Sequence, residues 1–218
     1  MDHPILSKPT DETIKWLTEL REYAIKTNKE WADKLGIPQS AAITTVKPSG
    51  TVSILAGESP GVHWTPGGEY FLRAIRFKND DPMVLLFKSF GYRVEPAAES
   101  PDSTSVIFFP IKSEAKRSEK DVSIYEKIAL AATAQRYWSD NSVSVTISFD
   151  QEKEAKDIEK VLHMYDGQLK TVSFLPMGNA VYEQMPYTEI SEAEYNKFTD
   201  KLMPIDLSGV YRGNAVDA

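Results

Sequence analysis

Near the N-terminus, apolar residues recur every three or four positions between Thr10 and Leu35, which is the period of an amphipathic helix. These positions are Ile14, Leu17, Leu20, Tyr23, Ala24, Trp31 and Leu35. Pro9 to Glu12 forms a suitable helix start with acidic residues in its first turn, and Gly36-Ile37-Pro38 forms a stop. We therefore predict a long helix that packs on a sheet, after a loose lead-in over residues 1–9.

Further along the chain, β-branched, aromatic and alternating residues indicate strands. The predicted strands cover residues 41–46, 69–77, 105–110, 141–149 and 168–175. Pro110 and Pro176 are expected to end the third and the fifth of them, because proline cannot donate to a strand ladder.

The stretch 141–149 has the clearest two-residue period. Its apolar face holds Val143, Val145, Ile147 and Phe149, and its hydroxyl face holds Ser142, Ser144, Thr146 and Ser148. An apolar face toward covering helices and a hydroxyl face toward a lumen suit a barrel strand. An antiparallel strand with its polar side in water has the same period, so periodicity leaves both readings open.

Helix starts recur between the strands. Asp81-Pro82 introduces a helix over 83–90, Ser123 and Glu126 have capping-box spacing, and Asp150 is expected to cap the next helix, which Gly167 stops. Ser191 and Glu194 repeat the capping-box spacing for a last helix that ends near Leu202. The alternation of strands and helices predicts an α/β architecture.

The most informative stretch is residues 44–53, Thr-Thr-Val-Lys-Pro-Ser-Gly-Thr-Val-Ser, which resembles a strand end, a tight turn and a helix start. Pro48 restricts φ, Gly50 permits unusual dihedrals, and Ser49 or Thr51 is suited to cap the helix. Such a turn directs unpaired N–H groups to one place, where the helix dipole favours a phosphate. A plain capped turn has the same composition, and this alternative stays open.

Composition narrows the function classes. The 218 residues carry a net charge of −7, which argues against a nonspecific binder of duplex DNA. No apolar run approaches the length of a membrane span, and no signal peptide is visible at Met1 to Pro4, so we predict a cytoplasmic protein. The chain has no cysteine, which excludes disulfides, thiolate metal sites and thiyl chemistry within it.

Two further residues are candidates for ligand contacts. His63 lies in the glycine- and proline-rich stretch 57–68, and long loops of this kind are often functional. The histidines His3, His63 and His163 are far apart in sequence, so we predict no metal site and leave open whether His63 contacts a ligand or only belongs to the loop. Arg73 is placed to reach a phosphate or cofactor edge, or to pair with surface carboxylates.

Several blocks in order resemble the adenosylcobalamin-dependent (class II) ribonucleotide reductases, in particular the ribonucleoside-triphosphate reductase type. The resemblance covers most of the chain. The blocks are Val46–Ser53, Leu55–Gly57, Ser59–His63, Tyr70–Arg76, Gln135–Thr146, Val172–Pro176 and Tyr182–Tyr187.

The resemblance implies a role for the turn and for its surroundings. It implies that Pro48, Ser49, Gly50, Thr51, Val52 and Ser53 hold the phosphates of a ribonucleotide substrate. It also favours a barrel position for 141–149, with Asn141 and Ser142 near the substrate channel. The fold it implies is the C-terminal portion of a ten-stranded α/β barrel. Residues 1–40 would be the lead-in and amphipathic helix, 41–207 the barrel segment with the phosphate loop, and 208–218 a flexible tail.

In this family, cysteines carry the thiyl radical and reduce the sugar, and adenosylcobalamin is the cofactor of the complete enzyme. Since the chain has no cysteine, we predict no catalytic residue in it and no activity of the chain alone. Its expected partner is the N-terminal remainder of the reductase, in trans or as a missing portion. The alternative is a non-catalytic nucleotide- or phosphate-binding module that keeps the loop without the chemistry.

Overall fold

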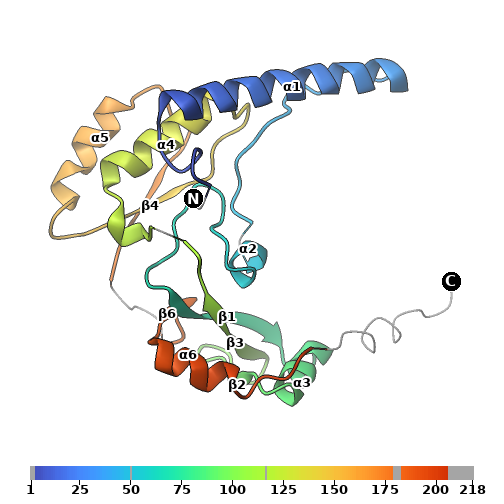
Figure 1. Ribbon diagram of the computed structural model, residues 1–218, viewed down its shortest axis with the longest axis vertical. Helices are drawn as coiled ribbons and strands as arrows, with labels where there is room; N and C mark the ends of the chain where they lie inside the picture. The colour runs from blue at the N-terminus through green and yellow to red at the C-terminus, as the bar shows by residue number, and fades with distance from the viewer. Residues whose placement is uncertain (1–2, 50, 116, 179–182, 206–218) are drawn as a thin grey trace. The chain divides into compact units, whose positions relative to one another are not determined.

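The computed structural model describes residues 3–49, 51–115, 117–178 and 183–205 (Figure 1), and for Thr51 the backbone alone. The predicted tail over 208–218 lies outside these residues. Contacts divide the chain into two compact units, one of residues 1–69 and 113–179 and one of 70–112 and 180–218. Each contains helices and strands, which confirms the α/β class.

The first unit begins with the long helix α1, Asp11–Leu35, as predicted. The Thr10 side chain accepts a hydrogen bond from the Thr13 N–H at its start, and Gly36 ends it in the left-handed conformation at φ 65°. Helix α1 was predicted to pack on a sheet, but its main contact is with helix α4, Ile124–Tyr137. Helix α4 also begins at its predicted cap, Ser123.

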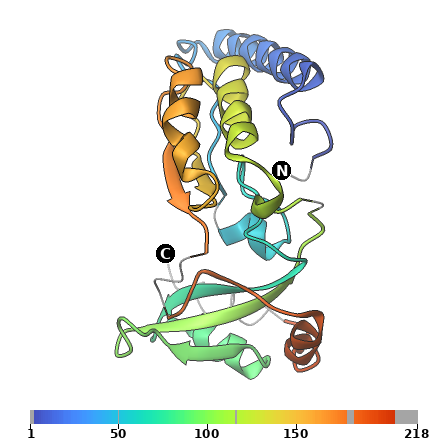
Figure 2. The same cartoon turned by 90° about the vertical axis from the view of Figure 1, so that its left-hand side faces the viewer.

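A parallel pair of strands forms the sheet of the first unit. Strand β4, Thr146–Phe149, pairs with β5, Ser173–Pro176, and helix α5, Ile158–Met164, lies between them in sequence after the 3₁₀ turn η2, Ala155–Asp157. Figure 2 shows α4 and α5 side by side. The core of the unit contains Val62, Ile124, Ile128, Ala131, Ala134, Val143, Val145, Ile147, Phe149 and Val161.

This pairing tests the open readings of 141–149. Its apolar face is buried as predicted, but only residues 146–149 pair as a strand. Because β4 and β5 run parallel, the antiparallel reading is wrong for this pair, and their βαβ connection is typical of α/β proteins. The described residues themselves form a two-stranded and a four-stranded sheet, so the ten-stranded barrel stays a prediction.

Three sequence predictions fail wholly or in part in the first unit. The strand predicted over 168–175 begins only at Ser173, in β5. The predicted strand 41–46 belongs to no sheet, since the carbonyls of Thr44 and Val46 accept hydrogen bonds from residues 140, 141 and 144 without a regular ladder. The helix expected after Asp150 begins later, at Ile158. Asp150 instead accepts hydrogen bonds from the two amides of Glu152 and Lys153, which closes a local turn.

The second unit is a four-stranded antiparallel sheet in the order β2-β3-β1-β6. Its strands are β1 Tyr70–Lys78, β2 Arg93–Pro96, β3 Thr104–Lys112 and β6 Tyr187–Glu189. The sequence predicted β1 and β3 but neither short outer strand. Helices α3, Pro82–Ser89, and α6, Glu192–Thr199, start at their predicted caps, Asp81 and Ser191, and contact the sheet.

Strand β3 continues through Pro110, which was predicted to end it. The Ser113 N–H donates to the Glu69 carbonyl at 2.8 Å, and hydrogen-bonded pairs alternate along an antiparallel ladder. Pro110, opposite Leu72, therefore falls at a non-hydrogen-bonded pair and its nitrogen faces away from β1. On that side β2 has already ended opposite Phe108, so the missing donor breaks no ladder bond.

Candidate phosphate-binding loop

The segment that leads into the predicted phosphate turn, residues 43–47, is tied down along its backbone. The Asp140 carboxylate accepts from the N–H groups of Ile43 and Thr44 at 2.9 and 3.2 Å. The Trp138 indole N–H donates to the Thr45 carbonyl at 3.1 Å, and the Ser144 N–H donates to the Val46 carbonyl at 3.0 Å. Together these bonds hold the segment in a fixed course despite the absence of a ladder.

Gly61 supports the next residue of the segment. It has a φ of +62°, and a Cβ placed on it would lie 3.2 Å from the Lys47 carbonyl oxygen. The backbone of the glycine-rich loop therefore approaches Lys47 more closely than a side chain would comfortably allow. Beyond this contact, Pro48 and Ser49 are exposed.

The turn ends in a short helix, α2, Thr51–Leu55, as predicted. Ile54 is buried and anchors it, whereas Val52 is 74% exposed. Among the described residues, no backbone carbonyl outside α2 accepts a hydrogen bond from the N–H of Val52 or Ser53. N–H groups in the first turn of a helix have no intrahelical acceptor, so a side chain, water or a ligand can satisfy them. Gly50 lies outside the described residues.

Ser53 carries the most unusual polar atom of this loop. Within the described part of the chain, its Oγ is buried and has no hydrogen-bond partner. A buried hydroxyl without a partner costs free energy, so most such groups are satisfied. A ligand that reaches the start of α2 would provide the missing partner.

His63 is bonded through both ring nitrogens. Its Nδ1 lies 3.0 Å from the Pro60 carbonyl oxygen, and its Nε2 accepts a hydrogen bond from the Thr146 N–H at 3.0 Å. Desolvation by burial lowers the pKa of His63 and favours the neutral ring. Of the two readings left open for this residue, the structure favours the loop residue, because neither nitrogen remains for a ligand.

Arg73 is held by contacts within the chain. It lies on β1 in the second unit, donates to the Pro186 carbonyl at 3.0 Å and stacks 4.5 Å above the Tyr187 ring. These contacts join β1 to the chain leading into β6. They give Arg73 a structural role, and its predicted contact with a phosphate or cofactor stays a prediction.

Asn141 and Ser142 precede β4 in the first unit. The Asn141 N–H donates to the Thr44 carbonyl at 3.3 Å, and the Ser142 hydroxyl lies 2.7 Å from the Thr171 hydroxyl. Asn141 is thus joined to the lead-in of the phosphate turn. Their predicted contact with substrate stays a prediction.

Asp140 is the residue of this region that the sequence analysis did not select. Besides the two amides, it accepts a hydrogen bond from the guanidinium of Arg21 on α1, and this bond with the two amide bonds holds the pKa of the carboxyl far below its usual range. Only an acidic residue directly before a predicted strand marked the position in the sequence, and that signal is common. Its partners at positions 43 and 44 are distant in the chain.

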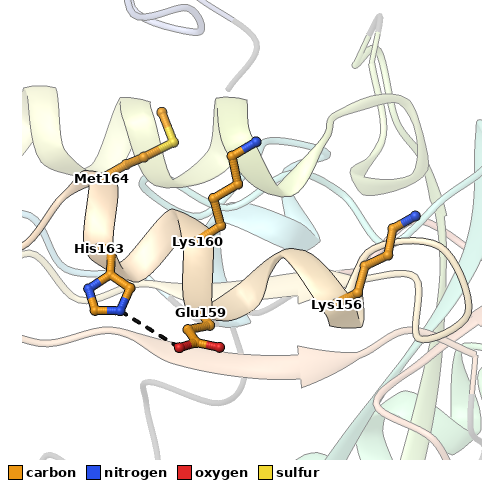
Figure 3. A pocket seen from close by; sticks show the side chains of 5 residues that line it. All are labelled: Lys156, Glu159, Lys160, His163 and Met164. Atoms are coloured by element: carbon orange, nitrogen blue, oxygen red, sulfur yellow. Dashed lines mark ion pairs between the residues drawn. The ribbon is translucent and has the colours of Figure 1, made fainter.

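A shallow hollow on α5 has no assigned chemistry (Figure 3). Five side chains line it: Lys156, Glu159, Lys160, His163 and Met164. Within it, His163 and Glu159 form an ion pair at 3.8 Å with both side chains mostly exposed, and such pairs contribute little. In the part of the chain that the structure describes, no group of three or more acidic or histidine side chains could hold a metal ion. No helix there has the length and apolar character needed to cross a membrane.

Comparisons with known proteins agree with the predicted resemblance. The chain is 42% identical over 198 residues to a probable adenosylcobalamin-dependent ribonucleoside-triphosphate reductase of Dictyostelium discoideum, which covers 88% of this chain and 25% of that protein. It is 38% identical over 202 residues to the adenosylcobalamin-dependent ribonucleoside-triphosphate reductase of Euglena gracilis, covering 91% of this chain and 27% of that one. No family model matches the chain.

A solved structure gives the same result. The crystal structure of a B12-dependent (class II) ribonucleotide reductase matches 96% of this chain with a TM-score of 0.78 and 34% identity, over 29% of its own length. The chain therefore spans between a quarter and a third of the proteins it matches. The 218-residue chain thus belongs, as a partial segment, to the family of adenosylcobalamin-dependent ribonucleoside-triphosphate reductases.

Proposed function

We propose that this chain is the substrate-phosphate-binding, barrel-closing C-terminal segment of a reductase that makes deoxyribonucleotides by thiyl-radical chemistry. Similarity to such reductases over most of the chain supports the assignment. The absence of cysteine means that the thiyl radical and the reducing thiols must come from other polypeptide. The chain is therefore inactive alone and acts with the remainder of the reductase. The cytoplasmic location and the lack of direct DNA binding stay predictions.

In this proposal, the phosphate loop is residues 48–53, and it holds the terminal phosphates of a ribonucleotide. The N–H groups of Val52 and Ser53 stand at the start of α2, where an anion is favoured. The observation that carries the proposal is the Ser53 hydroxyl at the same helix start, a buried polar atom for which the described residues supply no partner. Each charge-assisted hydrogen bond to a phosphate is worth about 1.5–3 kcal/mol, so three or four would anchor the substrate.

No described residue is identified as a contact for adenosylcobalamin, which the resemblance assigns to the complete enzyme. Cobalt ligation by histidine needs a free ring nitrogen, and both nitrogens of His63 are engaged within the chain. His3 accepts hydrogen bonds from two nearby amides through Nδ1, and His163 stands on the exposed face of α5. We therefore assign no residue of this chain to the cofactor, which the related reductases are named for.

Complementation tests this function. A Dictyostelium discoideum reductase that lacks the matching segment would be mixed with this chain, and ribonucleotide reduction would be measured with adenosylcobalamin present. We expect turnover with the chain and none without it. The relative's own segment, added back in the same way, is the positive control.

The other outcomes are equally informative. If the relative's own segment restores turnover and this chain binds a ribonucleotide without turnover, the chain is the non-catalytic nucleotide-binding module of the alternative. If calorimetry shows that the chain binds no ribonucleotide, alone or in the complex, then the assignment of residues 48–53 to the phosphates is wrong.

A further inference from the structure

We propose that Asp140 is a positioning residue that holds the phosphate loop in the shape that binds nucleotide. This inference rests on the proposed function of residues 48–53. Asp140 lies in the link between α4 and β4, away in sequence from the loop that it orders. It acts through the backbone of the lead-in segment, residues 43–47, and not through contact with a ligand.

Both carboxylate oxygens of Asp140 are used. Oδ2 accepts hydrogen bonds from the consecutive N–H groups of Ile43 and Thr44, at 2.9 and 3.2 Å, and Oδ1 faces the guanidinium of Arg21. Two adjacent amides that point to one oxygen restrict the backbone dihedrals between them. The charge on Asp140 strengthens both bonds relative to a neutral acceptor.

Thr44 closes the contact from the opposite direction. The Asp140 N–H donates to the Thr44 hydroxyl at 3.1 Å, and that hydroxyl in turn donates to the Trp138 carbonyl. Thr44 is 3% exposed, so solvent does not compete for these bonds. The link between Asp140 and Thr44 is therefore reciprocal: each backbone N–H donates to the side chain of the other.

Arg21 orients the carboxylate from α1. It reaches Asp140 from a helix that has its own packing against α4, so the ion pair connects α1 to the lead-in segment. The other cation at this position, Lys170, donates to the Asp140 backbone carbonyl and leaves the carboxylate to Arg21. Arg21 thus orients the Asp140 carboxylate so that Oδ2 faces the two backbone N–H groups.

The lead-in segment matters because the structure shows few supports for the described residues of the phosphate loop. Pro48 and Ser49 are exposed, whereas every residue from 43 to 47 makes a backbone hydrogen bond or a close backbone contact within the first unit. A loop that binds an anion through N–H groups must already hold them in one arrangement. Otherwise the entropy cost of ordering them on binding would lower the affinity. Asp140 provides that order from one end of the loop, while Ile54 anchors the other.

The test uses the whole chain and two substitutions of different kinds. Asp140→Ala removes both acceptors. The double substitution Arg21→Gln with Asp140→Asn replaces the ion pair by two amides. The new side-chain oxygen at position 140 then accepts from Ile43 and Thr44, while the new NH₂ group donates to the amide oxygen introduced at position 21. Asp150→Asn is the matched control, because Asp150 also accepts from two consecutive amides in the same unit but closes a different turn.

Two measurements are made on each variant: amide hydrogen exchange without nucleotide, and CTP affinity by calorimetry. For Asp140→Ala we expect exchange at Ile43 and Thr44 to rise at least tenfold and CTP affinity to fall about tenfold to a hundredfold, while the amides of α4 stay protected. The double variant should recover most of the protection at Ile43 and Thr44 and most of the CTP affinity. Asp150→Asn should change neither the protection of these amides nor the affinity. Recovery by an uncharged pair distinguishes positioning from a general effect of charge.

Contrary outcomes separate the two proposals. If the amides of Ile43 and Thr44 stay protected in Asp140→Ala, or exchange rises while CTP affinity is unchanged, Asp140 does not position the loop. If the unsubstituted chain binds no CTP, alone or in the complex with the remainder of the reductase, the proposed function fails, and the exchange measurement still decides whether Asp140 holds the lead-in segment. If Asp140→Ala loses protection throughout α4, that variant is unfolded and cannot test the proposal. The exchange and CTP affinity of the double variant and of Arg21→Gln alone then decide whether Asp140 positions the loop.

Discussion

The Nε2 atom of His63 accepts a hydrogen bond from the backbone N–H of Thr146 at 3.0 Å. Because Nε2 is the acceptor, the ring proton is on Nδ1, which donates to the Pro60 carbonyl at 3.0 Å. One neutral imidazole thereby joins the glycine-rich loop 57–68 to the first residue of β4. The phosphate loop packs against that same glycine-rich loop at Gly61.

We predict that this contact weakens in acid. Burial lowers the pKa of His63, so the unfolded chain, with a pKa near ~6.5, takes up a proton that the folded chain resists. The contribution of His63 is therefore complete above that pH and decreases as the pH falls toward the lowered value of the folded state. Urea unfolding should show that His63→Ala costs about 1–2 kcal/mol at pH 7.5 and less at pH 5.5. A cost independent of pH would contradict the neutral tautomer, and the exposed His163→Ala serves as the control.

Ser53→Ala is expected to change stability and binding in opposite directions. Removal of this buried hydroxyl, which has no partner among the residues that the structure describes, should leave stability unchanged or raise it by about 1 kcal/mol. If the hydroxyl binds phosphate, affinity for a ribonucleoside triphosphate should fall about tenfold. Thermal unfolding and calorimetry measure the two effects. In the control, Ser89→Ala, the hydroxyl lost is one that donates to the Leu86 carbonyl, and nucleotide affinity should not change.

Lys127→Met should be strongly destabilising. The Lys127 side chain is almost fully buried, and its ammonium donates to the Glu119 and Ser148 carbonyls at 2.8 and 2.7 Å and to the Ser148 hydroxyl at 3.0 Å. Methionine keeps the length but leaves these acceptors without a donor, and we expect a loss of about 3 kcal/mol in the free energy of unfolding.

The exposed Lys156→Met on the same unit should stay within about 0.5 kcal/mol of the original chain. If both lysine substitutions had equally small effects on urea unfolding, the three bonds of Lys127 would not contribute to stability. Burial lowers the pKa of Lys127, while the nearby charges of Glu119 and Glu154 act in the opposite direction and favour the ammonium.

Two glycines with positive φ should respond differently to alanine. Gly91 has a φ of +91°, and a Cβ on it would lie 2.3 Å from the Lys201 carbonyl oxygen in the second unit. Gly167 has a φ of +71° with open space around it. Both substitutions incur backbone strain of about 1 kcal/mol, but Gly91→Ala also displaces backbone, so we expect it to cost about 2–4 kcal/mol. Equal midpoints in denaturant unfolding would contradict the close contact with Lys201.

The helix starts were predictable from the sequence because capping is local. Thr10, Ser123 and Ser191 each accept a hydrogen bond from an amide three residues later, and Asp81 from one two residues later. Such bonds depend on the residues of a single turn, so the pattern of nearby side chains determines them. Asp150 shows the limit of this reasoning, since the same local chemistry closed a turn instead of a helix.

The strand predictions failed where pairing decided the outcome. Residues 41–46 have the composition of a strand but no ladder partner, and Pro110 is tolerated only because β2 ends before it. The short strands β2 and β6 escaped prediction because they depend on pairing with β3 and β1 more than on their own few residues. A strand needs a neighbour, and the neighbour lies elsewhere in the chain.

The sequence by itself determined the class of the fold and most of the helix starts, and it proposed the place of the phosphate loop, because these depend on periodicity, capping and an ordered set of short blocks. Only the tertiary structure showed how the loop is held. The Asp140 bonds to Ile43 and Thr44 and the His63 bond to Thr146 join residues more than eighty positions apart. Hydrogen bonds act over about 3 Å, so their partners are decided by the folded path of the chain and not by order along it.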